Sequence, residues 1–171
     1  GLDSVDLNAA QDHGVAVLNT PEAPAQAVAE LTMGLMLSLL RQINQIDQAV
    51  RKGEWPRLQG RLLAAQTVGI IGIGHIGRRV ARLCQAFEAK VIAHDPFATQ
   101  VPQGVTLMPL EELLGSADII TLHLPYTPQT HHLLDRKSFA SLKSEAIIIN
   151  AARGGLIDEC ALAEALNSGR V

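Results

Sequence analysis

Short apolar runs alternate with amphipathic segments along most of the chain. Residues 67–71 form a continuous apolar run of strand length, and residues 76–87 repeat their apolar positions at helical spacing. The alternation continues to the C-terminus. Further strands are predicted at residues 90–94, 105–108, 118–122 and 146–149, and further helices at residues 110–114, 135–142 and 159–168. Continuous apolar strands that each precede a helix are typical of a parallel sheet covered on both faces, so the pattern predicts an α/β, doubly wound fold.

The first third of the chain has a different pattern. A short helix is predicted at residues 7–12 and a strand at residues 15–18, before a long helix over residues 25–52. The apolar stripe of the long helix, at steps of three and four, comprises Val28, Leu31, Leu35, Leu39, Ile43, Ile46 and Val50. Its first half is apolar on nearly every side and requires cover on every side, either from this chain or from a second subunit.

Composition narrows the class of protein. The chain has 171 residues, of which 47% are hydrophobic and 18% charged, so one packed domain is expected and a disordered chain is excluded. The net charge of −3 gives no electrostatic basis for binding nucleic acid or an anionic membrane. Two cysteines make no disulfide framework, which favours a cytoplasmic location. His131 and His132 are adjacent and lack further ligands at zinc spacing, so no metal site is predicted.

Gly72, Gly74 and Gly77 form the pattern G-x-G-x-x-G between a predicted strand and a predicted helix. Alone the pattern is weak because glycine-rich turns are common, but within a βαβ unit it is typical of dinucleotide binding. The first glycine allows a tight turn, the second lets the backbone approach a pyrophosphate, and the third lets helix and strand pack closely. The backbone N–H groups of His75 and Ile76 would then hold the phosphates. The alternative is a purely structural turn.

Asp95 ends the strand that follows this helix. In Rossmann-type folds, an acidic residue about 20 positions beyond the glycines binds the hydroxyls of the adenosine ribose. No lysine or arginine occurs in residues 96–103, where a 2′-phosphate would need a cation, so NAD is favoured over NADP. The alternative is a turn residue that precedes Pro96.

Two further polar residues follow predicted strands at the same edge of the sheet. Arg153 comes directly after the strand that ends at Asn150, and His123 comes after the preceding strand. Ligands of open α/β sheets bind beyond the carboxyl ends of the strands, where an arginine can hold a carboxylate through two parallel hydrogen bonds. The alternatives are a surface arginine in a loop and a structural histidine.

Four motifs, in their order along the chain, resemble the D-isomer-specific 2-hydroxyacid dehydrogenase family: TVGIIGIGHIGRRVA, HDP, LHLPYTPQTHHLLD and NAARGGLIDE. The resemblance covers nearly the whole chain and points to phosphoglycerate dehydrogenase-like members. It implies that Arg153 binds the substrate and polarises its carbonyl. It also implies that Ala151, Ala152 and Arg153 meet the nicotinamide side of NAD. Pro125 and Thr127 would line the cofactor cleft.

The resemblance also divides the chain. Residues 1–20 are expected to be a remnant of the substrate domain, and residues 21–171 an NAD-binding domain truncated at its C-terminal end. The glutamate and the general acid–base histidine of the family would fall after Val171, so we expect this chain to bind NAD without turnover on its own. A homodimer is expected through the helix at residues 25–52. The alternative, from a different class, is a corepressor-like protein that senses NAD(H) and acts through protein partners.

Overall fold

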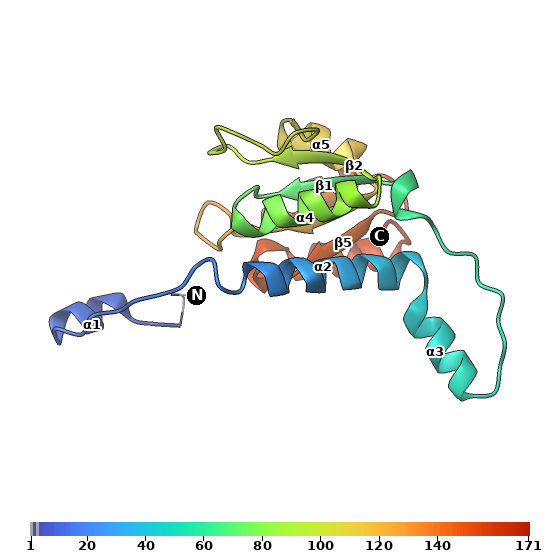
Figure 1. Ribbon diagram of the computed structural model, residues 1–171, viewed down its shortest axis with the longest axis horizontal. Helices are drawn as coiled ribbons and strands as arrows, with labels where there is room; N and C mark the ends of the chain where they lie inside the picture. Colours follow the sequence, from blue (N-terminus) through green and yellow to red (C-terminus); the bar gives the residue numbers. More distant parts are fainter. Residues whose placement is uncertain (1, 3) are drawn as a thin grey trace.

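Five parallel β-strands form the centre of the molecule (Figure 1). The computed structural model describes residue 2 and residues 4–171. The order along the sheet is β3-β2-β1-β4-β5, so the direction of strand addition reverses between β1 and β4. The strands are β1 (Thr67–Ile71), β2 (Lys90–His94), β3 (Thr106–Leu107), β4 (Ile119–Leu122) and β5 (Ile147–Asn150). The predicted parallel, doubly wound sheet is confirmed.

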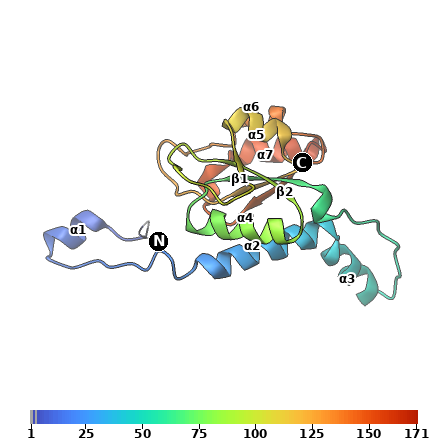
Figure 2. The ribbon, with the colours of Figure 1, turned by 45° about the horizontal axis from the view of Figure 1, so that its top comes forward.

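Helices cover both faces of the sheet (Figures 1 and 2). One face carries α2 (Ala25–Leu40) and α4 (His75–Ala86), and the other carries α5 (Leu110–Ser116), α6 (Arg136–Ser141) and α7 (Glu159–Asn167). Alternate residues of β1 serve the two faces. Val68 and Ile70 lie in the core beneath α2 and α4, whereas Ile71 lies in the core beneath α5. Burial on both faces is the reason why this strand is continuously apolar.

The other elements are short. They are the helices α1 (Leu7–Asp12) and α3 (Ile43–Arg51) and the 3-10 turns Leu63–Ala65 and Gly154–Leu156. Every strand predicted from residue 67 onward, and every helix predicted from residue 76 onward, lies within about two residues of its predicted bounds. Their ends follow local signals, since Asp135 and Asp158 cap α6 and α7 by accepting hydrogen bonds from backbone N–H groups.

The single long helix predicted over residues 25–52 is wrong, because the chain is broken into α2 and α3. The backbone N–H of Arg61 donates to the carbonyl of Leu40 at 2.8 Å. That carbonyl would otherwise accept the next hydrogen bond of the helix. Gln42 follows in the left-handed region, with φ of 54°, and its side chain donates to the carbonyl of Gln59. A contact with a distant part of the chain therefore ends α2, and local periodicity could not reveal it.

The predicted apolar stripe of this segment faces outward rather than into the core. Leu31, Leu35 and Leu39 are exposed. The buried face of α2 is formed instead by Ala25, Ala29, Thr32, Met33, Met36 and Leu40. On α4 the buried Sγ of Cys84 lies 3.7 Å from the sulfur of Met33. Both faces of α2 are apolar at helical spacing, and the face with small alanines is the one that can pack closely against α4.

The N-terminal segment extends away from the sheet (Figure 1). α1 has its predicted bounds and is capped by the side chain of Asp6. The strand predicted at residues 15–18 is wrong, because these residues are irregular and Val15 and Leu18 are exposed. A strand requires hydrogen-bonded neighbours, and this segment runs outside the sheet. Gly1 and Asp3, which belong to the predicted remnant at residues 1–20, lie outside the described residues.

Candidate functional site

The glycine turn joins β1 to α4 at the carboxyl edge of the sheet. Gly72 has φ of 91°, and a Cβ placed on it would lie 2.6 Å from the carbonyl oxygen of His123. Its N–H donates to the carbonyl of His94 at 2.9 Å. The turn is therefore held between the ends of β2 and β4, at the reversal of strand order where open α/β sheets bind ligands.

The two later glycines shape the approach to α4. A Cβ on Gly77 would lie 2.1 Å from the carbonyl oxygen of Gly72, so the helix packs directly against the turn. Apart from the residues next to it in the chain, a Cβ on Gly74 would meet no described residue within 4 Å, so this side of the turn is open. α4 begins at His75, and no described side chain caps it. The backbone N–H groups of His75 and Ile76 thus stand at an accessible, positive helix end that fits a pyrophosphate.

Asp95 lies beside the glycine turn. Its Oδ2 accepts from the N–H of Ile73 and its Oδ1 from the N–H of Phe97, both at 2.9 Å. Each carboxylate oxygen has a further lone pair for a ribose hydroxyl. The structure therefore brings the acidic residue and the glycines together as the spacing predicted, while its contact with ribose stays a prediction.

The loop after β4 carries the next three predicted residues. Thr130 orders this loop: its Oγ1 accepts from the N–H of Thr127 at 2.7 Å and lies 2.9 Å from the carbonyl of Pro125. His123 is largely buried, with Nε2 2.9 Å from Oγ1 of Thr121. Burial lowers the pKa of His123 to about 4. This histidine is therefore neutral at pH 7 and is suited to shape the cleft rather than to carry charge.

We expect His123 to make the chain less stable as the pH falls. Its pKa is about 4 when folded against an ordinary 6.5, so between these values the unfolded chain binds a proton that the folded chain does not. The free energy of unfolding should fall by about 2 kcal/mol between pH 7 and pH 5 through this residue. Urea unfolding at both pH values measures the change.

The His123→Gln variant should lose most of this pH dependence, because glutamine can still pair with Thr121 but does not titrate. His13→Gln, which changes an exposed histidine at the end of α1, should keep it. If the free energy of unfolding of His123→Gln falls with pH as much as that of the unmodified chain, His123 is not the cause of the pH dependence.

The loop after β5 carries Arg153, which is exposed at the carboxyl edge of the sheet. Asn150 organises this loop from the last position of the strand. Its Oδ1 accepts from the N–H of Ala152 at 3.0 Å, and its Nδ2 donates to the carbonyl of Arg153 at 2.8 Å. The ring of Tyr126 packs against Gly155, where an added Cβ would lie 2.6 Å from it. Ala151, Ala152 and Arg153 thus project from the end of the strand next to β4.

Several residues of the site were not expected from the sequence. Asn150 could have been found, because an Asn at a strand end before a turn commonly bonds the backbone two residues on. Glu22 gave no such signal, yet its Oε1 lies 3.6 Å from Nδ1 of His75, beside the glycine turn. Arg78 and Gln85 of α4 also bond to nearby loops. Their contacts depend on the tertiary fold.

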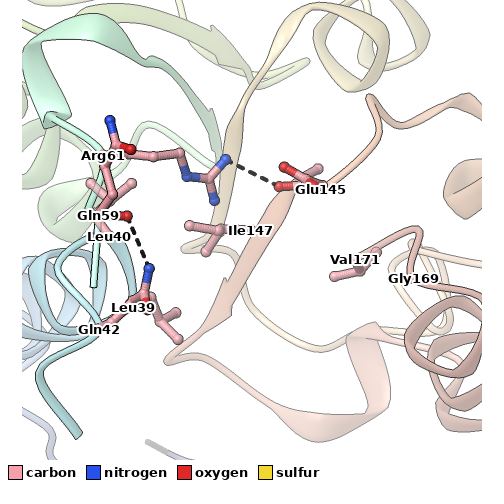
Figure 3. Close-up of a pocket in the computed structure, with 10 residues that line it drawn as sticks. Leu39, Leu40, Gln42, Gln59, Arg61, Glu145, Ile147, Gly169 and Val171 are labelled. Carbon is pink, nitrogen blue, oxygen red and sulfur yellow. Dashed lines mark hydrogen bonds between the residues drawn. The ribbon is translucent and has the colours of Figure 1, made fainter. Parts of the chain in front are cut away.

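A cavity of about 460 Å³ lies elsewhere, at the amino end of β5 (Figure 3). Leu39, Arg61, Glu145 and Ile147 are among its lining residues, and Arg61 donates to the carbonyl of Glu145. Because all strands are parallel, this end is opposite the glycine turn.

Among residue 2 and residues 4–171, no cluster of three His, Cys, Asp or Glu side chains could hold a metal ion, and no helix is long and apolar enough to cross a membrane.

The sequence matches a known family of nucleotide-binding domains. Residues 33–171 match the family described as D-isomer specific 2-hydroxyacid dehydrogenase, NAD binding domain. The chain belongs to this family. The 2-hydroxyacid dehydrogenase family resemblance is thereby confirmed, and NAD is the cofactor of its domain. The matched residues include the glycine turn, Asp95 and Arg153.

Curated 2-hydroxyacid dehydrogenase relatives are longer than this chain. D-3-phosphoglycerate dehydrogenase from Methanocaldococcus jannaschii is 45% identical over 177 residues, which cover 100% of this chain and 34% of that protein. Hydroxypyruvate reductase from Thermotoga maritima is 44% identical over 173 residues, which cover 100% of this chain and 56% of that protein. The chain therefore spans only part of the length of these relatives.

Solved structures share the fold. The apo-structure of D-lactate dehydrogenase from Escherichia coli has a TM-score of 0.93 and 35% identity, covering 100% of this chain and 55% of that chain. D-lactate dehydrogenase from Aquifex aeolicus, complexed with NAD and lactic acid, has a TM-score of 0.88 and 34% identity, covering 99% and 53%. All four of these relatives are named as dehydrogenases or reductases, and none of the four is named as a corepressor.

Proposed function

We propose that this chain is the cofactor-binding part of a dehydrogenase that transfers a hydride between NAD and C2 of a small D-2-hydroxy or 2-oxo acid. The observation that carries the proposal is the glycine turn, which stands at the reversal of strand order with Asp95 bonded to it. The names of the relatives support the substrate class.

Two parts of the site hold the pyrophosphate and the adenosine ribose of the cofactor. The N–H groups of His75 and Ile76 bind the pyrophosphate at the start of α4. Asp95 accepts hydrogen bonds from the ribose hydroxyls and repels a 2′-phosphate, which selects NAD over NADP. Pro125 and Thr127 line the cleft on the other side of the turn.

Arg153 acts on the substrate. When bound, NAD supplies or accepts the hydride at nicotinamide C4. Arg153 holds the substrate carboxylate through paired hydrogen bonds and draws electron density from the C2 carbonyl. Ala151 and Ala152 contact the nicotinamide side, and Asn150 keeps their loop in place. Proton transfer at the substrate hydroxyl needs a general acid–base residue, which the family resemblance gives as a histidine, and turnover is tested in the full-length protein.

Calorimetric titration with NADH and NADPH tests the cofactor assignment. We expect the chain to bind NADH more tightly than NADPH, and Asp95→Asn to weaken NADH binding by about ten-fold and to remove the preference. The reason is that a hydrogen bond to a charged group contributes about 1.5–3 kcal/mol.

Asp47→Asn is the matched control, because Asp47 is an exposed carboxylate of α3 that pairs with Arg51. It should leave both affinities unchanged. Circular dichroism on each sample shows whether the variant is folded. Equal affinity of the unmodified chain for NADH and NADPH would contradict the role of Asp95.

We propose further that the chain forms a homodimer through α2 and α3, and that residues 1–20 belong to a separate substrate domain. The exposed row formed by Leu31, Leu35, Leu39 and Ile43 supports the dimer, because contiguous apolar rows of this kind mark interaction surfaces. The extended position of α1, away from the sheet, supports the domain division. The two free cysteines, Cys84 and Cys160, support a cytoplasmic location.

The double substitution Leu35→Lys and Leu39→Lys should convert a dimer into a monomer, since it places two charges in the proposed interface. Sedimentation velocity measures the change. Leu166→Lys, at an exposed leucine of α7 on the other face of the sheet, is the control and should leave the mass unchanged. A dimer that survives the double substitution would place the interface elsewhere.

A further inference from the structure

Ile73, at the centre of the glycine turn, is hydrogen bonded on both sides. Its N–H donates to Oδ2 of Asp95 at 2.9 Å, and its carbonyl accepts from Nε of Arg78 at 3.0 Å. Its side chain is buried in the core, with 1% of its surface exposed. The position of the turn is therefore set by the end of β2 and by one arginine of α4.

Arg78 also reaches the loop that follows β2, residues 96–104. Its Nη2 donates to the carbonyl of Gln100 at 2.8 Å, so one guanidinium group connects this loop to the glycine turn. Gln85, two turns further along α4, donates from Nε2 to the carbonyl of Gln103 at 2.7 Å. Two side chains of one helix thus hold the same loop at two points.

We propose that Arg78 is a positioning residue for the adenosine half of the cofactor. Residues 96–104 directly follow Asp95, the ribose-binding residue of the proposed site, so this loop forms a wall beside the adenosine. Arg78 holds the wall at a set distance from the turn that binds the pyrophosphate. The inference rests on the proposed function and adds a residue that contacts neither the ribose nor the phosphates.

Arginine suits this position because its planar fork donates in more than one direction. A lysine has a single nitrogen and cannot reproduce the spacing of the bonds to Ile73 and Gln100. A binding site whose loop is already ordered binds its ligand more tightly, since binding does not have to order the loop. Gln85 holds the same loop at a point further from the glycine turn. Its variant therefore tests whether holding the loop is sufficient or whether the link to the glycine turn is required.

The test is calorimetric titration of the chain with NADH and, separately, with ADP-ribose, which keeps the adenosine, the pyrophosphate and the second ribose but lacks the nicotinamide ring. Arg78→Met is expected to weaken the binding of both NADH and ADP-ribose about ten-fold. This factor corresponds to one hydrogen bond of a charged group. Arg78→Lys should recover part of this loss. Gln85→Met should weaken binding by less than about three-fold, although it loosens the same loop. Arg82→Met removes another exposed arginine of α4 and should change neither affinity.

Each other outcome overturns the inference. Equal losses in Arg78→Met and Gln85→Met would mean that fastening of the loop is sufficient. Weaker binding of NADH without weaker binding of ADP-ribose would place the effect of Arg78 at the nicotinamide end of the cofactor. Should Arg78→Met not fold, Arg78→Lys decides, and full affinity in that variant overturns the proposal. If the unmodified chain binds neither ligand, the proposed function fails as well, whereas unmodified binding that Arg78 variants leave unchanged overturns this inference alone.

Discussion

Gly77→Ala is expected to abolish the NADH binding that calorimetric titration detects and to lower the melting temperature by about 10 °C. The added Cβ would lie 2.1 Å from the carbonyl oxygen of Gly72, which is far inside contact distance. Backbone atoms cannot rotate away as a side chain can, so α4 or the glycine turn must shift. Overpacking of this kind costs about 3 kcal/mol, and each kcal/mol lowers the melting temperature of a domain of this size by about 2–4 °C.

Gly115→Ala is the matched control. Gly115 lies in α5, away from the glycine turn and from the proposed dimer surface, and an added Cβ there would lie 3.8 Å from the carbonyl oxygen of Ser141, which is an ordinary contact. Alanine is favoured over glycine inside a helix by about 0.5–1 kcal/mol, so this variant should melt slightly higher and bind NADH normally. Normal NADH binding by Gly77→Ala would show that close packing of α4 on the turn does not shape the pyrophosphate site.

Arg153→Gln is expected to lower kcat/KM of the full-length enzyme by about 10²–10³-fold, while NADH binding stays within about two-fold. Loss of one preorganised donor to a developing charge costs about this factor, and the amide also loses the charge that holds the carboxylate. Steady-state kinetics with a 2-oxo acid and NADH measures the loss, and calorimetry measures the cofactor affinity.

Arg153→Lys separates charge from geometry at the same position. Lysine keeps the positive charge but cannot make two parallel hydrogen bonds to a carboxylate, so it should recover only a small part of the lost activity. Arg136→Gln is the surface control, because Arg136 pairs with Glu164 on α7. An Arg153→Gln enzyme with wild-type kcat/KM would remove Arg153 from the mechanism.

Much of the geometry of the proposed cofactor site could be predicted because it depends on short segments. The spacing of Gly72, Gly74 and Gly77 places the turn between strand and helix, and Asp95 and Arg153 each follow an apolar run. In a parallel sheet all carboxyl ends meet at one edge, so the sequence alone indicated that these residues share an edge. The apolar runs themselves predicted the strands, because burial on both faces requires them.

Contacts between distant segments could not be predicted in this way. The sequence by itself determined the strands and helices from residue 67 onward, where Asp135 and Asp158 begin helices, and that the turn with Gly72, Gly74 and Gly77 joins a strand to a helix. Only the tertiary structure decided that the Leu40 carbonyl pairs with Arg61 and ends α2, and that one guanidinium group joins the glycine turn to the loop after β2. Local patterns report the conformational preferences of neighbouring residues, whereas these hydrogen bonds form only after packing has brought their partners together.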